Sequence, residues 1–181
     1  DFDNLTEENI YVLDSPILTN SQLKKFKKFF SKKVKVIDCT FNIERSLKER
    51  IESIREEAET AVREGSTCLI LSDKNITNQK ASIPSILTVG AVHSHLVKHG
   101  LRGYCSLNVE CSDAMDTHSF AILIGVGATT VNPYLAIDSI YQRFEKKLFG
   151  KSDFETCVNK FKKSIDAGLL KIMSKMGISV I

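Results

Sequence analysis

Short apolar segments alternate along the chain with amphipathic segments of ten or more residues, and this alternation constrains the fold more than any other feature. The clearest unit begins at Ser46-Leu-Lys-Glu49, a capping box whose serine hydroxyl can accept a hydrogen bond from the Glu49 amide. Apolar residues then recur at helical spacing up to Gly65, which suits a left-handed C-cap. Residues 67–71 follow as an apolar run, which is typical of a strand covered on both faces. The unit therefore predicts a helix followed by a buried strand.

The same alternation continues on both sides of this unit. A helix over 84–99 carries apolar residues on nearly all sides, which predicts that most of it is buried, and the polar residues 74–82 predict a loop. The other predicted strands are 11–13, 34–38, 104–110 and 129–132, and the other predicted helices are 20–30, 113–124, 134–148 and 154–176. Strands joined through such helices pair in parallel through right-handed crossovers. The sequence thus predicts an α/β domain with alternating β-α units and a mainly parallel sheet, either doubly wound or a partial barrel.

Composition excludes several classes of protein. With 43% apolar and 26% charged residues, the chain is neither disordered nor collagen-like. A net charge of +3 is too weak to require a nucleic-acid partner, and no segment approaches the ~20 apolar residues of a membrane span. The five cysteines are odd in number and several lie in apolar runs. We therefore expect buried, reduced thiols and an intracellular protein, in the cytoplasm or a plastid-like organelle.

Polar residues stand at or next to the carboxyl ends of four predicted strands: Asp38, Asp73, Glu110 and Asn132. In parallel α/β folds this edge of the sheet is where ligands bind. The alternative is that these side chains cap loops and the helices that follow. The second interpretation is favoured, because no acid, base and nucleophile converge in the sequence.

Three histidines and two cysteines are candidate metal ligands by residue type. His95 and His99 are four residues apart on one predicted helix and can face one ion, whereas His93 points elsewhere. Cys105 and Cys111 lie on one predicted strand without a third cysteine at a suitable spacing for an iron–sulfur site. Packing and polar contacts are the favoured interpretation for the histidines, and buried thiols for the cysteines.

A run of seven lysines without an acid occupies residues 24–35. A basic amphipathic helix of this kind can bind acidic membranes or nucleic acid. Because a predicted strand follows directly at Val34, the favoured interpretation is an ordinary helix of the domain, with its phenylalanines in the core and its lysines in solvent.

Several segments, taken in order, resemble one known family. They are Leu13-Asp-Ser-Pro-Ile-Leu18, Ile37-Asp-Cys-Thr-Phe41, Glu56-Glu-Ala-Glu-Thr-Ala-Val-Arg-Glu-Gly65, Leu69-Ile-Leu-Ser-Asp73, Ile83-Pro-Ser-Ile-Leu87, Val89-Gly-Ala-Val-His-Ser-His-Leu96, His118-Ser-Phe-Ala-Ile-Leu-Ile-Gly125, Val131-Asn-Pro-Tyr-Leu-Ala136 and Gly168-Leu-Leu-Lys-Ile-Met-Ser-Lys-Met-Gly-Ile178. From about residue 11 to the end, the chain resembles the central region of the large, glutamine-dependent glutamate synthase chain.

The resemblance implies a parent chain that converts glutamine and 2-oxoglutarate into two glutamates, with electrons delivered through FMN and an iron–sulfur cluster. It implies a central domain that is a reduced relative of the flavin barrel. Such a domain holds the glutaminase and FMN-binding domains in register and contributes to the wall of the ammonia path. Catalytic, cofactor-binding and metal-binding residues are not assigned to it, so none is carried over here, and the chain alone is expected to be inactive.

The chain departs from the family pattern at three places. Met115 stands where the family usually has arginine, Ser119 where it has a second histidine next to His118, and His93-Ser-His-Leu96 where His-His-His-Leu is common. Methionine cannot make the bidentate contacts of arginine, which puts polar interdomain contacts at 115 and 119 in question. His118 remains a candidate for an interdomain contact.

The expected organisation is a linker over 1–10, the α/β central domain over 11–150 and a helical connection over 151–181 that leads toward the flavin-binding domain. Residue 1 is Asp and the last residues are apolar, so we expect a piece of a longer chain. Two alternatives remain open. One is a stand-alone small-molecule-binding domain or enzyme that uses Asp38, Asp73 and Glu110, and the other is an interaction module that uses the lysine run.

Overall fold

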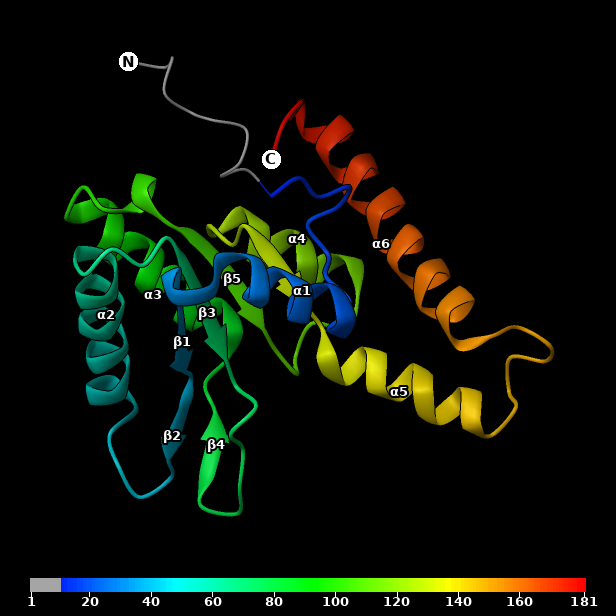
Figure 1. The fold of residues 1–181 in the computed structure, drawn as a ribbon, viewed down its shortest axis with the longest axis horizontal. Helices are drawn as coiled ribbons and strands as arrows, with labels where there is room; N and C mark the ends of the chain where they lie inside the picture. Colours follow the sequence, from blue (N-terminus) through cyan, green and yellow to red (C-terminus); the bar gives the residue numbers. More distant parts are fainter. Residues whose placement is uncertain (1–10) are drawn as a thin grey trace.

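The structure is a computed structural model and describes residues 11–181, so the predicted linker over 1–10 lies outside the described residues. Its strands are β1 (Val34–Asp38), β2 (Thr40–Asn42), β3 (Cys68–Ser72), β4 (Lys80–Ser82), β5 (Ser106–Glu110) and β6 (Thr130–Asn132). Its α-helices are α1 (Asn20–Phe30), α2 (Leu47–Arg63), α3 (Ser85–Lys98), α4 (Thr117–Gly125), α5 (Tyr134–Glu145) and α6 (Phe154–Met176). This order confirms the predicted α/β class (Figure 1).

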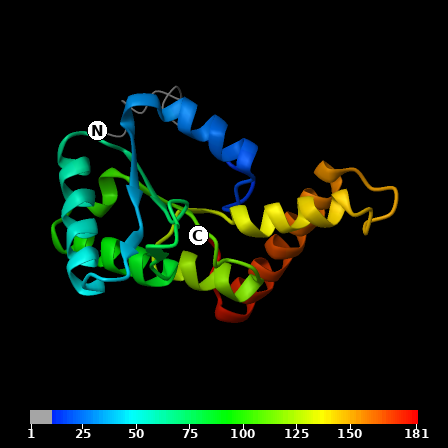
Figure 2. The same cartoon turned by 90° about the horizontal axis from the view of Figure 1, so that it is seen from below.

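The main sheet has four parallel strands in the order β1-β3-β5-β6. The strand order never reverses, unlike in a doubly wound sheet, so right-handed crossovers place α2, α3 and α4 on one face. Helix α1 covers the opposite face (Figure 2). Successive strands are thus added at the same edge, as in the wall of a β/α barrel. The sheet is open, because β1 and β6 do not pair within residues 11–181.

The alternation of side chains in β3 explains why this strand is buried along its whole length. Leu69 and Leu71 belong to the larger core, against α2, α3 and α4, whereas Cys68 and Ile70 belong to the smaller core under α1. Because both faces are covered, every residue of the strand can be apolar or small.

Helix α1 contains most of the lysine run and packs on the sheet through its phenylalanines. This agrees with the prediction of an ordinary helix of the domain. Thr19 and Gln22 form a capping box at its start. Phe26 is buried and Phe30 half-buried, and Tyr11 packs edge-on against Phe26. Phe29 is 45% exposed, so the apolar face extends beyond the core.

Two predictions about strands were wrong. Residues 11–13 form no strand, and the first contact with the sheet is a single bridge between Ile17 and Val131, because Pro16 has no amide hydrogen to extend a ladder. Part of the predicted loop over 74–82 is strand β4, which pairs with β2 in a second, two-stranded antiparallel sheet. This β2–β4 sheet projects below the main sheet in Figure 1.

Other predictions shift at their boundaries. Helix α4 begins at Thr117, four residues later than predicted, because the Asp116 carboxylate accepts the Ser119 amide and caps it there. Residues 102–104 form a short 3-10 helix, so Cys105 and Cys111 flank β5 instead of sharing it. Helix α5 ends at Glu145. Helix α3 is less buried than predicted, since Ile86, Leu87 and Val97 are exposed.

Helix α6 packs against α4 and α5 through Cys157, Val158, Ile165 and Leu169. Its buried Lys162 lies 2.9 Å from Asp14, so the helix is also tied to the first described segment of the chain. All five cysteines are buried and unpaired, as predicted. The division of the chain at residue 150 remains a prediction. None of the helices in residues 11–181 combines the length and apolar content that crossing a bilayer requires.

Candidate functional site

The parallel register brings the predicted polar residues to one edge of the sheet. Asp38 is aligned with Ser72, Ser72 with Glu110, and Glu110 with Asn132. Asp73 follows β3 directly, and its amide donates to the Glu110 carbonyl at 3.2 Å. The four candidates that the sequence placed at strand ends therefore line the same carboxyl edge.

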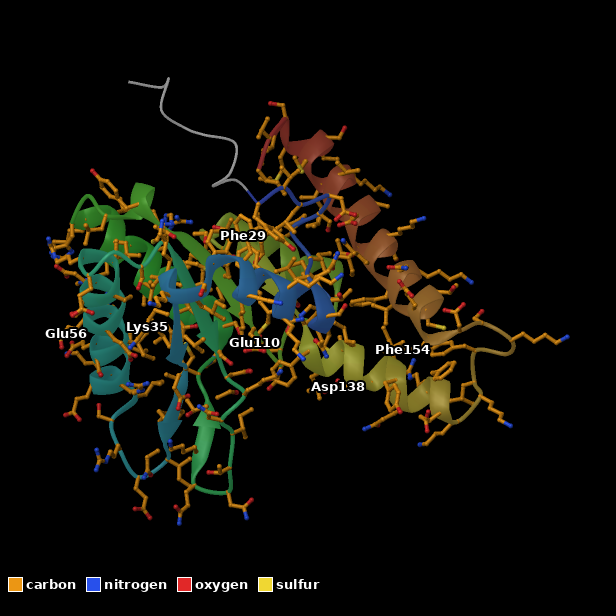
Figure 3. All side chains as sticks on the ribbon, in the orientation of Figure 1. Phe29, Lys35, Glu56, Glu110, Asp138 and Phe154 are labelled. Carbon is orange, nitrogen blue, oxygen red and sulfur yellow. The ribbon has the colours of Figure 1, made fainter. Side chains whose placement is uncertain are left out.

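Glu110 is the centre of this edge and is only 4% exposed. Its Oε1 lies 2.9 Å from the Lys74 ammonium and its Oε2 lies 3.3 Å from that of Lys27, a residue of α1. Glu110 is labelled in Figure 3. The Ser72 hydroxyl donates to Oε2 at 2.9 Å. Burial is the largest influence on the pKa of Glu110 and raises it. The Lys74 hydrogen bond, the charge of Lys27 and the Ser72 hydroxyl outweigh burial and leave this pKa below its ordinary value.

Asp73 ties the loop after β5 to the end of β3. Its Oδ2 accepts from the amide of Ser112 at 3.0 Å and from the Ser112 hydroxyl at 2.6 Å. Tyr134, at the start of α5, lies beside the same carboxylate. Burial first, and then the hydrogen bond to Asp73 and its charge, raise the pKa of Tyr134, so the phenol keeps its proton at neutral pH.

Asn132 belongs to a buried polar strip on the face of the sheet that α1 covers. Its amide nitrogen donates to the Leu18 carbonyl and to Asn20 Oδ1, both at 2.9 Å. One step across the sheet, Asn108 donates to the Leu69 carbonyl at 3.0 Å and accepts from the Thr130 hydroxyl at 2.8 Å. The inner face of this partial barrel is thus polar at β5 and β6.

Asp38 lies at the outer end of the edge. Its Oδ1 accepts from the Thr40 amide and hydroxyl, and Lys80 lies 3.9 Å from Oδ2. Burial raises the pKa of Asp38, but the Thr40 and Asn75 hydrogen bonds and the charge of Lys80 bring it below its ordinary value. Asp38 therefore connects β1 to the β2–β4 sheet.

The structure does not join His118 to this cluster. His118 is exposed in the first turn of α4, where it lies near Asp116. Ser119, at the place of the family's second histidine, donates its hydroxyl to Asp116 at 2.6 Å. Met115 is exposed.

Sequence reasoning missed several contributors to this edge. Lys27 comes from α1 and Lys74 from the predicted loop, and no spacing in the sequence joins either to Glu110. Asn108 carried a usable signal, because an asparagine inside an apolar strand indicates a buried hydrogen-bond network. Asp113, which accepts the Ser85 amide and hydroxyl, caps α3 from a distant loop.

The polar groups of the carboxyl edge are bound mainly to one another and to their own domain. The carboxylates are held by lysines, hydroxyls and amides of the same domain, which fits the interpretation that strand-end residues cap loops and helices. Two thiols lie nearby, Cys39 and Cys111, and burial raises the pKa of each to about 12. Neither therefore supplies a thiolate nucleophile at neutral pH.

Comparison with known proteins places this fold and edge in a family. The sequence model described as "Glutamate synthase central domain" matches residues 3–181. The chain belongs to the glutamate synthase central domain family. The "Glutamate synthase [NADPH] large chain" of Azospirillum brasilense is 46% identical over 179 residues, which cover 97% of this chain and 12% of the relative.

Other relatives carry the same activity in their names. The "Glutamate synthase [NADPH] large chain" of Bacillus subtilis (strain 168) is 40% identical over 93% of this chain and 11% of its own length. The "Ferredoxin-dependent glutamate synthase, chloroplastic" of Spinacia oleracea is 38% identical over 94% of this chain and 11% of its own length. The chain thus spans about 12% of the length of these relatives.

The cofactors that the family resemblance implies do not fit the residues described here. An iron–sulfur cluster needs several thiolates around one centre, and within residues 11–181 the one group of three possible metal ligands that gathers contains no cysteine. For FMN, the Lys27 and Lys74 ammonium groups at the carboxyl edge are both paired with Glu110, and that of Lys80 faces Asp38. No chemical step through either group is derived from this domain.

Proposed function

We propose that this domain joins the glutaminase and FMN-binding domains of a longer, intracellular glutamate synthase chain and holds them in register. The whole chain would make glutamate from glutamine and 2-oxoglutarate, with FMN and an iron–sulfur cluster in its other domains. One observation carries the proposal: the domain exposes two separate apolar surfaces, at opposite ends of its sheet.

The first is the α2–α3 groove, which lies between the first turns of these helices. It encloses about 630 Å³ and is lined by the apolar residues Leu47, Ile51, Ile86, Leu87 and Ala91, by Gly90, and by the charged residues Lys48, Glu52 and Arg55. Leu87 is 41% exposed, although the helix that carries it packs on the core. Apolar side chains gathered around a groove are typical of a surface that another protein or domain covers.

The second is the α6 surface, at the other end of the sheet. A cavity of about 760 Å³ lies between α6, the end of α4 and the segment 13–16, with Ile124, Leu169 and Met173 in its wall. Next to it, Leu170 is 65% exposed on α6. In Figure 1, α2 and α3 lie at the left of the sheet and α6 at the right.

This arrangement fits a domain with a neighbour at each end. The polar edge between the two surfaces is fixed by ion pairs and caps, so movement at one surface would be transmitted through a stiff body. Such a body can keep two catalytic domains at a constant separation and orientation.

The ammonia path is the finer part of the proposal. Asp73 Oδ1 and Asn132 Oδ1 are buried near the carboxyl edge and accept no hydrogen bond from any described residue. Oxygen acceptors of this kind suit a small hydrogen-bond donor such as ammonia. They support a place for this edge in the wall of the path.

A stoichiometry measurement tests the proposal in the full-length synthase. The reaction consumes one glutamine for each 2-oxoglutarate when ammonia transfer is tight. Leu87→Glu in the α2–α3 groove and Leu170→Glu on the α6 surface place charges at the proposed interfaces. We expect each to raise the ratio of glutamine consumed to 2-oxoglutarate converted at least twofold, because separated domains release ammonia to solvent.

Glu56→Gln, at an exposed position of α2, is the matched control and should leave the ratio near one. A ratio that stays near one in both leucine variants, with full activity, would contradict the linking role. In the isolated chain, ammonia release from glutamine above a buffer blank would contradict its assignment as a non-catalytic domain.

A further inference from the structure

The C-terminal halves of α2 and α3 bring together a second group of polar side chains, which the carboxyl edge does not use. Glu59 comes from α2, His95 comes from the last turn of α3, and His99 is the residue that caps the end of that helix. One potential ligand atom from each residue lies within 4.8 Å of the other two. The two helices pack side by side, and the C-terminal end of α2 lies away from the β2–β4 sheet in Figure 1.

The carboxylate of Glu59 faces both imidazoles with the same oxygen. Oε2 lies 2.6 Å from His95 Nε2 and 3.9 Å from His99 Nδ1. The two rings are 4.3 Å apart between centroids. Glu59 and His95 are half-buried and His99 is exposed, so the group is open to solvent on one side.

Arg63 fixes the direction of this carboxylate. Its guanidinium binds Glu59 Oε1, with both Nε and one terminal nitrogen at 2.8 Å. Oε2 is thereby left for the imidazoles. A group that holds a ligand from behind is typical of metal sites, where it fixes the ligand's orientation.

We propose that Glu59, His95 and His99 form a binding site for a divalent transition-metal ion, with Zn²⁺ as the best match. Two imidazole nitrogens and one carboxylate oxygen are a ligand set that zinc accepts, with water in the fourth position. Metal–ligand bonds of about 2.0–2.1 Å require ligand atoms ~3.3–3.4 Å apart. The distance from Glu59 Oε2 to His95 Nε2 must therefore increase by roughly 0.7 Å, and that to His99 Nδ1 must decrease by roughly 0.5 Å.

Both adjustments are within reach of side-chain rotation. His99 Nδ1 now lies 2.8 Å from the His95 carbonyl, and binding a metal there moves its proton to Nε2 and breaks that hydrogen bond. The carbonyl keeps a partner, because the His99 amide donates to it at 3.2 Å. The bound ion would connect α2 to α3 and stabilise their packing.

Zinc titration of the 181-residue chain tests the site, after far-ultraviolet circular dichroism has verified that each variant is folded. We expect one Zn²⁺ per chain and a thermal midpoint raised by about 5–10 °C at a free concentration one hundred times Kd. His99→Ala and Glu59→Gln should each weaken binding at least tenfold. His99 is exposed, so its replacement does not disturb the core.

Two control variants make the same substitutions, His→Ala and Glu→Gln, at positions outside the proposed site. His118→Ala removes an exposed histidine on α4 and Glu56→Gln an exposed glutamate one turn earlier on α2, and both should bind Zn²⁺ like the parent. Co²⁺ in place of Zn²⁺ should give visible d–d bands without a thiolate charge-transfer band. Unchanged affinity in His99→Ala, a thiolate band, or the absence of saturable binding would each overturn the proposal.

Discussion

Two clusters in this domain are built around a glutamate, and they differ in what surrounds the carboxylate. Glu110 is buried and both of its oxygens face cations, those of Lys74 and Lys27. Glu59 lies near the surface, gives one oxygen to Arg63 and turns the other toward two imidazoles. A carboxylate that cations already neutralise holds structure together, whereas one that shares an oxygen with imidazoles can still accept a metal ion.

The largest effect is expected at Glu110. Glu110→Gln leaves two ammonium groups without their carboxylate, and we expect the free energy of unfolding to fall by about 2 kcal/mol. This is less than the ~3–5 kcal/mol of a fully buried pair, because both lysines reach solvent. Urea unfolding measures it, with Glu56→Gln as the control that should change stability by less than about 0.5 kcal/mol.

The pH dependence of this difference gives an independent check on Glu110. Because its pKa is lower in the folded state, the stabilisation is present above the ordinary glutamate pKa of about 4.3 and is lost as pH falls below it. The gap between the parent and Glu110→Gln should therefore shrink at acid pH. A gap that is constant from pH 6 to pH 3 would show that the ion pairs are not its source.

A smaller effect is expected in the polar strip beside Glu110. Asn108→Leu keeps the branched shape and the number of heavy atoms but removes the donor to the Leu69 carbonyl and the acceptor of the Thr130 hydroxyl. We expect a loss of about 1–2 kcal/mol in urea unfolding, because buried polar partners remain unpaired. A stability equal to that of the parent would mean that an apolar inner face is equally acceptable, and that the strip has no structural role.

His93 sharpens the comparison, because it faces a cation instead of a carboxylate. Arg102 Nε donates to His93 Nδ1 at 3.2 Å, and burial first, and then the Arg102 charge, lower the pKa of His93. Stability from this contact is present above the ordinary histidine pKa of about 6.5 and is lost as pH falls below it. From pH 7.5 to 5.5, the thermal midpoint of His93→Gln, which retains an acceptor, should fall less than that of the parent. Equal falls would contradict a neutral His93.

The smallest effect on stability is expected at Glu59. Glu59 is half-buried and its ion-pair partner Arg63 is exposed, so without metal the urea midpoint of Glu59→Gln should stay close to that of the parent. A clear loss of stability without metal would show that the cluster is structural, like the one around Glu110, and would remove the distinction between the two.

The sequence predicted the elements that depend on local spacing and missed those that depend on distant partners. Helix α2, its Ser46 cap and the positive φ of Gly65 were predicted because each follows from residues within one or two turns. The β2–β4 sheet was missed because its strands have only three residues each, too few to show a period. The start of α4 was wrong because several residues before it can serve as a cap.

The candidate site shows the same division. Parallel pairing was enough to predict that Asp38, Asp73, Glu110 and Asn132 share one edge. The lysines that bind Glu110 come from a helix on the other face and from a loop, so nothing local identifies them. For the same reason His95 and His99 could be paired from their spacing, but Glu59 on α2 could not be added.

Hydroxyl-radical footprinting of side chains, in the isolated chain and in the full-length synthase, tests the linking role most directly. Two neighbouring domains should cover both ends of the sheet. Modification of Leu87 in the α2–α3 groove and of Leu170 on the α6 surface should therefore fall at least threefold in the full-length protein, while buried Phe120 stays unmodified in both. Equal modification of Leu87 and Leu170 in the two proteins would show that neither surface is covered and would contradict the account.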